Sequence, residues 1–369
     1  MRAGGAERVV SILIKEFTKV KNLEVHLVLL NNRIEYEIAD NVTVNILSDG
    51  ELKDGVSTYF KINSLAKKYA IYCLDNKIDS SVSFMYKSNY INTRSKKYNP
   101  TIKAIVCERS YPSNSYPNKG LKNYIARKLI SYFYNKADLV ITNSRLSAKD
   151  LKNNFDVSSP IVTVYNPFLG KFSGRQLRKP RPYTFINVAN LYAYKNQNLI
   201  IDSFSKIKDK NSQLIIIGQG EMHQNLEDQI QKLDLMDRVQ LLGYQKNPSS
   251  FLEQSDCFVL ASAHEGFPNV LLEAINCGLS IISSDCKSGP REILAPQSNI
   301  EVELSNDIEI AEYGILVPVG KITELVEAME MVMINKDLVS EYRDKSEERI
   351  KEFDSSKISK RFLEHITDV

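Results

Sequence analysis

Two glutamates, Glu265 and Glu273, border the segment EGFPNVLLEA, whose residue types suit the binding of a phosphorylated ligand. Pro268 suits the first turn of a helix. The backbone N–H groups from Gly266 to Asn269 would then lie at a positive helix end, which can bind a diphosphate without a magnesium ion. If the segment is helical throughout, the two carboxylates are separated by roughly 2.2 turns and share one side. A capping Glu265 and a surface Glu273 form the alternative that the residues leave open.

Two further loops have residue types suited to a binding site. Gly218-Gln219-Gly220 follows an apolar run. Its two glycines either let the backbone pass close to a ligand or simply turn the chain. SGPREIL, residues 288–294, again makes a tight entry into a helix. Arg291 in the first turn of that helix opposes the helix dipole, which indicates either another task or an ion pair with a nearby carboxylate.

These loops follow short β-branched runs that alternate with amphipathic stretches, which predicts mostly parallel sheets covered on both faces. Residues 8–21 have helical periodicity, and Asn143 and Ser144 are natural caps for a helix from about Arg145 to Phe155. The Pro-, Gly- and Arg-rich stretch 167–182 breaks the pattern and predicts two α/β domains in series. The predicted strands are 24–30, 79–85, 101–110, 137–144, 160–167, 184–191, 213–220, 238–244, 257–262, 279–285 and 313–319.

Charge is distributed unevenly along the 369 residues. Residues 1–180 contain 29 Lys and Arg against 15 Asp and Glu, whereas residues 181–369 contain 19 against 30. The basic half suits an anionic partner, such as a membrane surface, a phosphorylated substrate or a nucleic acid. The five cysteines and four histidines are scattered without metal-ligand spacing, so buried reduced thiols and no metal site are expected. No apolar stretch has the length of a spanning helix or a signal peptide, which favours the cytoplasm.

The segment from Phe185 to Pro318 resembles the donor-binding domain of the family 4 retaining glycosyltransferases, which have the GT-B fold of two Rossmann-like domains with a donor-binding cleft between them. GGAERVV, residues 4–10, resembles the glycine loop of the acceptor domain in the same family. The motifs that carry the donor-domain resemblance are Lys195-Asn196-Gln197, Gly218-Gln219-Gly220, Glu265 through Glu273, SGPREIL and GILVPV at 314–319.

The resemblance implies a role for each matching residue. Glu273 would hold the ribose, Glu265 would contact the donor sugar, and Lys195 would neutralise the departing diphosphate, so Glu265 and Lys195 are the expected catalytic residues. Fixed cations and amide dipoles aimed at a leaving group that gains charge lower the barrier. The other residues expected at the donor are Gly266, Phe267, Pro268, Asn269, Val270, Asn190, Gly218 and Tyr244, and those expected on the acceptor side are Gly4, Gly5 and Arg109.

Three departures from the family pattern affect this interpretation. Asn190 stands where the family usually has an arginine, which removes one diphosphate-binding cation. Arg109 stands where a histidine is frequent on the acceptor side. The strand expected before Gly4, which normally lies inside the sheet, is absent from the sequence, so a misplaced start or a truncation is expected.

The helix expected at 119–136 carries five basic residues among tyrosines and a phenylalanine, which suits the plane of an anionic membrane. A solvated helix that packs its aromatics inward is the alternative. The expected domains are a membrane-facing acceptor domain (1–170), a linker (171–182), a nucleotide-sugar domain (183–354) and a terminal helix that packs back on the first domain (355–369).

The predicted function is retaining transfer of a hexose or N-acetylhexosamine from a nucleotide sugar, with UDP favoured, to a lipid-linked or other glycan acceptor. The enzyme would need no metal or cofactor, bind no nucleic acid, and lie on the cytoplasmic face of the membrane. A degenerate homologue that acts as a binding or scaffold subunit is the main alternative. Asn190 and the missing strand favour it, and the intact Glu265, Glu273 and Lys195 oppose it. A nucleotide-sugar epimerase of similar shape is opposed by the loop motifs. The sequence leaves open which sugar, base and acceptor are used.

Overall fold

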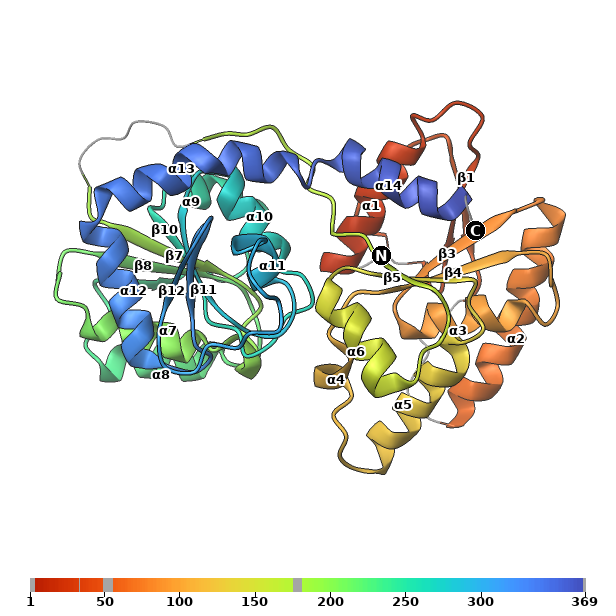
Figure 1. Cartoon of the computed structure of the whole chain (residues 1–369), viewed down its shortest axis with the longest axis horizontal. Helices are drawn as coiled ribbons and strands as arrows, with labels where there is room; N and C mark the ends of the chain where they lie inside the picture. The colour runs from red at the N-terminus through yellow and green to blue at the C-terminus, as the bar shows by residue number, and fades with distance from the viewer. Residues whose placement is uncertain (1–3, 33, 49–55, 175–180, 368–369) are drawn as a thin grey trace. The chain divides into compact units, whose positions relative to one another are not determined.

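The computed structural model describes residues 4–32, 34–48, 56–174 and 181–367, and the chain divides into two compact units. Unit 1 comprises Met1–Leu169 with Asp354–Val369, and unit 2 comprises Gly170–Phe353. Each unit has parallel strands and covering helices, which confirms the predicted fold class (Figure 1). Of the linker expected at 171–182, residues 175–180 lie outside the described residues.

Unit 2 is built on a seven-stranded sheet with the spatial order β12-β13-β11-β10-β7-β8-β9. All pairs are parallel except β12 with β13. The chain proceeds outward from β7 through β8 to β9 and then returns to the other side of β7 as β10. In open sheets of this kind, ligands bind beyond the carboxyl ends of the strands at the point where the order reverses. The strands are β7 (Thr184–Val188), β8 (Gln213–Ile217), β9 (Val239–Leu241), β10 (Cys257–Leu260), β11 (Ser280–Ser284), β12 (Glu309–Ala311) and β13 (Gly314–Val317).

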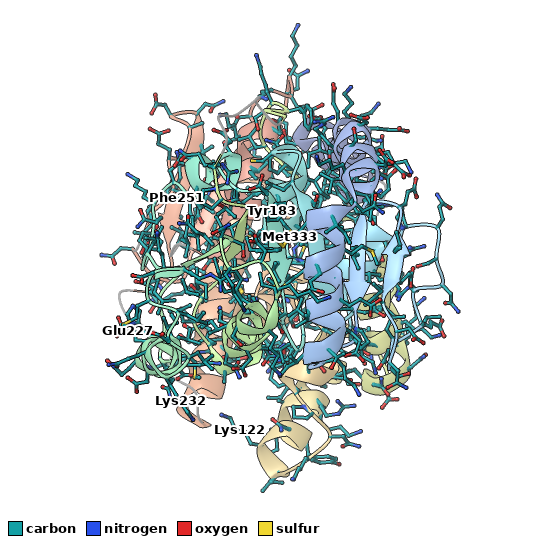
Figure 2. The ribbon with its side chains drawn as sticks, turned by 90° about the vertical axis from the view of Figure 1, so that its left-hand side faces the viewer. Lys122, Tyr183, Glu227, Lys232, Phe251 and Met333 are labelled. Carbon is teal, nitrogen blue, oxygen red and sulfur yellow. The ribbon has the colours of Figure 1, made fainter. Side chains whose placement is uncertain are left out.

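Helices bury both faces of this sheet, because its strands are apolar on both sides. Tyr183, just before β7, lies beside Met333 of α12, and its hydroxyl donates to the Val332 carbonyl at 3.3 Å (Figure 2). The helices are η1 (a 3-10 turn, Ala193–Lys195), α7 (Gln197–Lys206), α8 (His223–Lys232), α9 (Ser249–Glu253), α10 (Asn269–Asn276), α11 (Pro290–Leu294), α12 (Ile322–Ile334) and α13 (Lys336–Lys351).

Unit 1 contains two sheets of parallel strands. One has the order β3-β4-β5-β6, and the other is the pair β1-β2. Among the described residues, β1 pairs with β2 alone and β3 pairs with β4 alone, so each has an open edge. The strands are β1 (Val25–Leu29), β2 (Val42–Ile46), β3 (Ser80–Phe84), β4 (Lys103–Glu108), β5 (Leu139–Thr142) and β6 (Ile161–Thr163).

Helix α1 packs on both sheets of unit 1. Val9 and Leu13 lie in a cluster with residues of β4 and β5, whereas Ile14 packs against β1 and β2. The predicted range 8–21 was wrong at both ends, because Gly4 caps the helix and residues after Phe17 form turns. The helices of unit 1 are α1 (Gly5–Phe17), α2 (Val56–Asp75), α3 (Tyr86–Ser95), α4 (Pro112–Ser115), α5 (Leu121–Tyr134), α6 (Arg145–Phe155) and α14 (Ser355–Thr367).

Helix α14 belongs to unit 1 although it ends the described chain. Its Ile358, Phe362 and Ile366 join the cluster that contains Val9 and Leu13 of α1. The Ser355 hydroxyl donates to the Glu16 carboxylate at 2.9 Å, which fixes the start of α14 beside the end of α1.

The five cysteines are free and buried, which confirms the expected reduced thiols. Of the helices that the structure describes, none combines the length and the apolar character needed to cross a bilayer. In the same residues, His, Cys, Asp and Glu side chains form no group of three placed to hold a metal ion.

Candidate active site

The strands at the reversal of unit 2's sheet, β7 and β10, continue into two loops that meet. Lys195 ends the short η1 turn of the first loop, and Glu265 lies in the second. The Lys195 ammonium donates to Glu265 Oε1 at 2.6 Å, and the two side chains are only 15% and 10% exposed. The position predicted for ligand binding by the strand order therefore holds an ion pair between the two residues expected to be catalytic.

Backbone contacts fix the loops that carry this ion pair. The Ala263 N–H donates to the Tyr194 carbonyl at 2.8 Å, and the Asn196 side-chain amide donates to the Ala261 carbonyl at 3.0 Å. Asn196 has a φ of 52°, in the left-handed region that asparagine tolerates better than most residues. The ion pair is therefore held by the connection between the loops as well as by its own charges.

The two glycines of Gly218-Gln219-Gly220 lie against the first loop. A Cβ at Gly218 would lie 1.9 Å from the Ala189 carbonyl oxygen, and one at Gly220 would lie 2.4 Å from that of Leu191. The Leu191 N–H also donates to the Gln219 carbonyl at 2.9 Å. The close approach that requires glycine is thus to this chain's own backbone.

The segment EGFPNVLLEA is not helical throughout. Helix α10 begins at Asn269, so Glu265 lies in the preceding loop and the predicted geometry of two carboxylates on one helix was wrong. Glu273 lies within α10 and is half-buried. Phe267 is buried, and its ring lies 5.8 Å from that of Phe353. The loop is anchored by its phenylalanine and places Glu265 at the carboxyl edge of the sheet.

SGPREIL supports this loop from the neighbouring strand. The Ser288 hydroxyl donates to the Gly266 carbonyl at 2.6 Å. Gly289 has a φ of 95°, and a Cβ there would lie 2.5 Å from Pro268 Cδ. The segment therefore positions the Glu265 loop through direct contact.

Arg291 forms the ion pair that the sequence left as one of two alternatives. It is buried and donates to both carboxylate oxygens of Asp285, at 2.9 and 2.7 Å, and to Glu309 at 2.8 Å. Burial lowers the pKa of Arg291, but the hydrogen bonds to Asp285 and Glu309 outweigh this effect and raise it. Both carboxylates belong to unit 2, so Arg291 has a structural role there.

Asn190 and Tyr244, two further residues expected at the donor, are exposed. The Asn190 carbonyl accepts from the Gln197 side-chain amide at 3.1 Å, which ties the loop to the start of α7. Tyr244 follows β9, which is shorter than the predicted strand 238–244 because it ends at Leu241. The side chains of both residues are available at the surface.

In unit 1, Arg109 follows the carboxyl end of β4 and turns its guanidinium inward. The guanidinium carbon lies 5.2 Å from the centre of the Phe84 ring and 5.3 Å from that of Phe362. Its three nitrogens are buried and have no hydrogen-bond partner among the residues that the structure describes. Burial lowers the pKa of Arg109 because the charged form loses its hydration.

The backbone around Arg109 is held by Glu108, which sequence reasoning missed. This buried carboxylate accepts from the N–H groups of Arg109 and Ser110 at 2.9 and 3.0 Å and from the Tyr134 hydroxyl at 2.9 Å. Gly4 and Gly5, also expected on the acceptor side, lie at the start of α1, where the Tyr36 hydroxyl donates to the Gly4 carbonyl at 3.1 Å.

Comparison with known proteins covers nearly the whole chain. Residues 3–168 match the family model "Glycosyltransferase Family 4", and residues 171–353 match "Glycosyl transferases group 1". An uncharacterised glycosyltransferase of Methanocaldococcus jannaschii is 34% identical over 72% of this chain and 71% of its own length. This chain is a family 4 glycosyltransferase.

Two other proteins resemble this glycosyltransferase along almost its full length. The N-acetylgalactosamine-N,N'-diacetylbacillosaminyl-diphospho-undecaprenol 4-alpha-N-acetylgalactosaminyltransferase of Campylobacter jejuni is 28% identical over 99% of this chain and 96% of its own. The solved structure of Anabaena HepE in complex with UDP and glucose matches with a TM-score of 0.74 at 16% identity, over 100% of this chain and 97% of that chain. That likeness shows the GT-B fold.

Helix α5 of this glycosyltransferase combines features of both alternatives left open by the sequence, a helix that suits a membrane surface and a helix that packs its aromatic residues inward. Phe133 and Tyr134 are buried in the core of unit 1. Leu121, Tyr124 and Ile125, by contrast, are 74%, 56% and 49% exposed. The first half of α5 therefore presents an apolar surface to solvent, while Phe133 and Tyr134 of its second half pack inward and Tyr132 stays exposed.

The basic residues of α5 also differ in their surroundings. Arg127 donates to the carbonyls of Tyr116 and Asn154 and stacks 4.1 Å from the centre of the Phe155 ring, so it is engaged within unit 1. Lys122 and Lys128 are exposed (Lys122 is labelled in Figure 2).

Sequence reasoning also missed the aromatic residues beside the ion pair of this glycosyltransferase, Tyr192, Tyr194 and His264. Their rings lie in a nearly parallel row. The sequence shows Tyr192 and Tyr194 just before Lys195, but it does not show that a second loop places His264 beside Tyr194 and so completes the row.

Proposed function

We propose that this glycosyltransferase transfers a hexose or N-acetylhexosamine from a nucleoside diphosphate sugar, with UDP favoured, to a lipid-linked glycan, with retention of configuration. The observation that carries the proposal is the Lys195–Glu265 ion pair at the reversal of unit 2's sheet, 2.6 Å long and largely buried. A cation and a carboxylate at this position suit a ligand that has both a diphosphate and a sugar.

In this proposal Lys195 moves between two anions. Without donor it neutralises Glu265, and with donor it neutralises the diphosphate, whose charge grows as the bond to the sugar breaks. Glu265 is then free to accept hydrogen bonds from the sugar hydroxyls. Glu273 holds the ribose, and amides in the segment from Gly266 to Val270 contact the diphosphate.

A metal ion is not required in this proposal, because Lys195 and the amino end of α10 supply the positive charge that a metal would otherwise supply. The experimental expectation is that turnover survives chelation with EDTA. Complete loss of turnover, restored by manganese or magnesium, would contradict this part of the proposal.

The acceptor is proposed to be lipid-linked and to be met at an anionic membrane on its cytoplasmic side. The similar Campylobacter jejuni enzyme carries a diphospho-undecaprenol acceptor in its name. In this chain, the exposed apolar residues of α5 lie with Lys122 and Lys128 on one short helix, which suits the interface of an anionic bilayer. Gly4 and Gly5 are proposed for the acceptor side, together with Arg109, whose buried guanidinium would have to turn outward to reach an acceptor.

The proposal is tested by transfer from a panel of nucleotide sugars to a diphosphate-linked glycan. Lys195→Ala and Glu265→Gln should each lower turnover by about 10²-fold, the scale of losing one group that stabilises transition-state charge. Lys232→Ala and Glu227→Gln provide matched controls, because both residues are exposed on α8 (Figure 2) and should leave turnover unchanged. Equal turnover in the four variants would contradict the proposed site, and the anomer of the product, read by NMR, tests retention.

A further inference from the structure

Three aromatic rings lie in a nearly parallel row beside the Lys195–Glu265 ion pair. The Tyr194 ring lies 4.5 Å from the His264 ring at 11° and 6.0 Å from the Tyr192 ring at 20°. The Lys195 ammonium lies 5.2 Å from the centre of the Tyr194 ring. Tyr192, Tyr194 and His264 are called the ring row below.

Hydrogen bonds join the two loops that carry the ring row and fix the positions of the rings relative to one another. The Tyr194 carbonyl accepts from Ala263 N–H, next to His264, at 2.8 Å. Within the first loop, the Lys195 N–H donates to the Tyr192 carbonyl at 2.9 Å and closes the η1 turn. A binding surface built on such joined loops loses little conformational entropy when a ligand binds.

The two tyrosines of the ring row are partly exposed. Tyr192 and Tyr194 are 40% and 38% exposed, whereas Leu191 in the same loop is buried. Burial lowers the pKa of His264, Glu265 raises it and Lys195 lowers it again; the net lowering favours the neutral imidazole. Because Tyr194 is stacked between its two neighbours, the partly exposed Tyr192 ring at the end of the row is the one that can offer an electron-rich face to a ligand.

We infer that the ring row is a carbohydrate-binding platform that contacts the C–H face of a sugar ring. A pyranose has an apolar face of C–H groups that packs on aromatic rings, and its hydroxyls project outward to polar partners. Glu265, which the proposed function leaves free to accept hydrogen bonds from sugar hydroxyls, follows His264 in the chain and can serve as such a partner. The inference rests on the proposed function, and the sugar comes from one of two sources, the donor or the end of the acceptor glycan.

The test compares Tyr192→Ala with Tyr192→Phe in the full-length protein. Tyr192 is the end ring of the row, so its removal leaves the Tyr194–His264 contact in place. Three quantities are measured: the Kd of UDP by calorimetry, the KM of the nucleotide sugar and the KM of the acceptor glycan. Ile334→Ala, an exposed apolar residue at the end of α12, is the control for loss of exposed apolar surface.

The expected result is a rise of about 3- to 10-fold in one of the two KM values for Tyr192→Ala, the scale of one aromatic contact. The Kd of UDP should stay unchanged, and Tyr192→Phe and Ile334→Ala should match the parent. The KM that rises identifies the source of the sugar. An equal rise in the Kd of UDP would show that the rings hold the nucleotide, and unchanged KM values would show that they hold nothing; either result overturns the inference.

A separate arm distinguishes failure of this inference from failure of the proposed function. If the parent transfers no sugar from any donor, the proposed function fails. The ring row is then tested by saturation-transfer NMR with methyl pyranosides. Transfer to their C–H protons that weakens in Tyr192→Ala supports the platform, and no transfer with the parent overturns it.

Discussion

Replacement of Arg109 by methionine is expected to stabilise the protein, although most substitutions of buried residues destabilise it. All three guanidinium nitrogens are buried, and none has a hydrogen-bond partner in the described part of the chain. An unmade hydrogen bond at a buried group costs about 1–3 kcal/mol. The contacts with Phe84 and Phe362 recover about 0.5–2 kcal/mol, so the charge remains a net cost.

Methionine keeps an apolar side chain of similar length against the two phenylalanine rings. Exchange of a buried ion pair for well-packed apolar groups is often neutral or stabilising by about 1–4 kcal/mol, and for Arg109→Met we expect a gain in the lower part of that range. For a unit of this size, each kcal/mol raises Tm by about 2–4 °C. If Arg109 also serves the acceptor, the variant will be more stable and less active at once.

Arg127→Met is the matched control, because this guanidinium also lies on a phenylalanine but donates to two carbonyls. Its removal should lower stability by about 1–3 kcal/mol, since the carbonyls lose a charged donor. The assay is thermal and denaturant unfolding of both variants beside the parent. A shift of both variants in the same direction, or a lower Tm for Arg109→Met, would refute the reasoning.

Glu273→Ala should weaken UDP binding by calorimetry, by about 1.5–3 kcal/mol for each charge-assisted bond lost; equal affinity would remove Glu273 from the site. Joint replacement of Lys122 and Lys128 by glutamine should reduce cosedimentation with anionic vesicles, since each basic residue contributes about 1 kcal/mol near such a surface; identical cosedimentation would exclude these lysines. His264 has a lowered pKa in the folded state, so its contribution to the free energy of unfolding should be fully present above the pKa of the unfolded state and be lost as pH falls below that value. The fall in Tm between pH 7.5 and pH 5.5 should therefore be smaller in His264→Phe than in the parent, and an equal fall would oppose this. Finally, an apolar strand-forming segment fused ahead of residue 1 should pair with the open edges of β1 and β3 and raise Tm; an unchanged Tm would show that the edges do not accept a strand.

Features set by neighbouring residues were predictable from the sequence. Helix α6 runs from Arg145 to Phe155 as predicted, because its cap is local: the Ser144 hydroxyl accepts from the Ser147 N–H. Most of the parallel strands were predictable because their apolar runs are continuous. Strand β2, also parallel, was missed because most of its residues are exposed and it has no such run. Strand β12 was missed, since its three residues pair antiparallel at the sheet edge and carry little periodic signal.

Features set by contacts between loops were not predictable. Nothing local to Gly218 shows that the carbonyl of Ala189 will lie where its Cβ would be. The same limit applies to Glu265, whose distance from Glu273 depends on where α10 begins, and to His264, whose partner Tyr194 is 70 positions away. Lys195 and Glu265 were nominated by motif, but their direct contact is a property of the strand order.

Helix α14 also determines when unit 1 can be completed during synthesis. The residues of unit 2 leave the ribosome before Ile358, Phe362 and Ile366, which belong to the core of unit 1. The core of unit 1 therefore stays incomplete while unit 2 is synthesised, and apolar faces of α1 and β4 are uncovered during that time. Such exposed intermediates attract chaperones and aggregate. Unit 1 can therefore complete its core only after α14 has been synthesised. A chain that ends before residue 355 would contain all of unit 2 but would lack part of the core of unit 1.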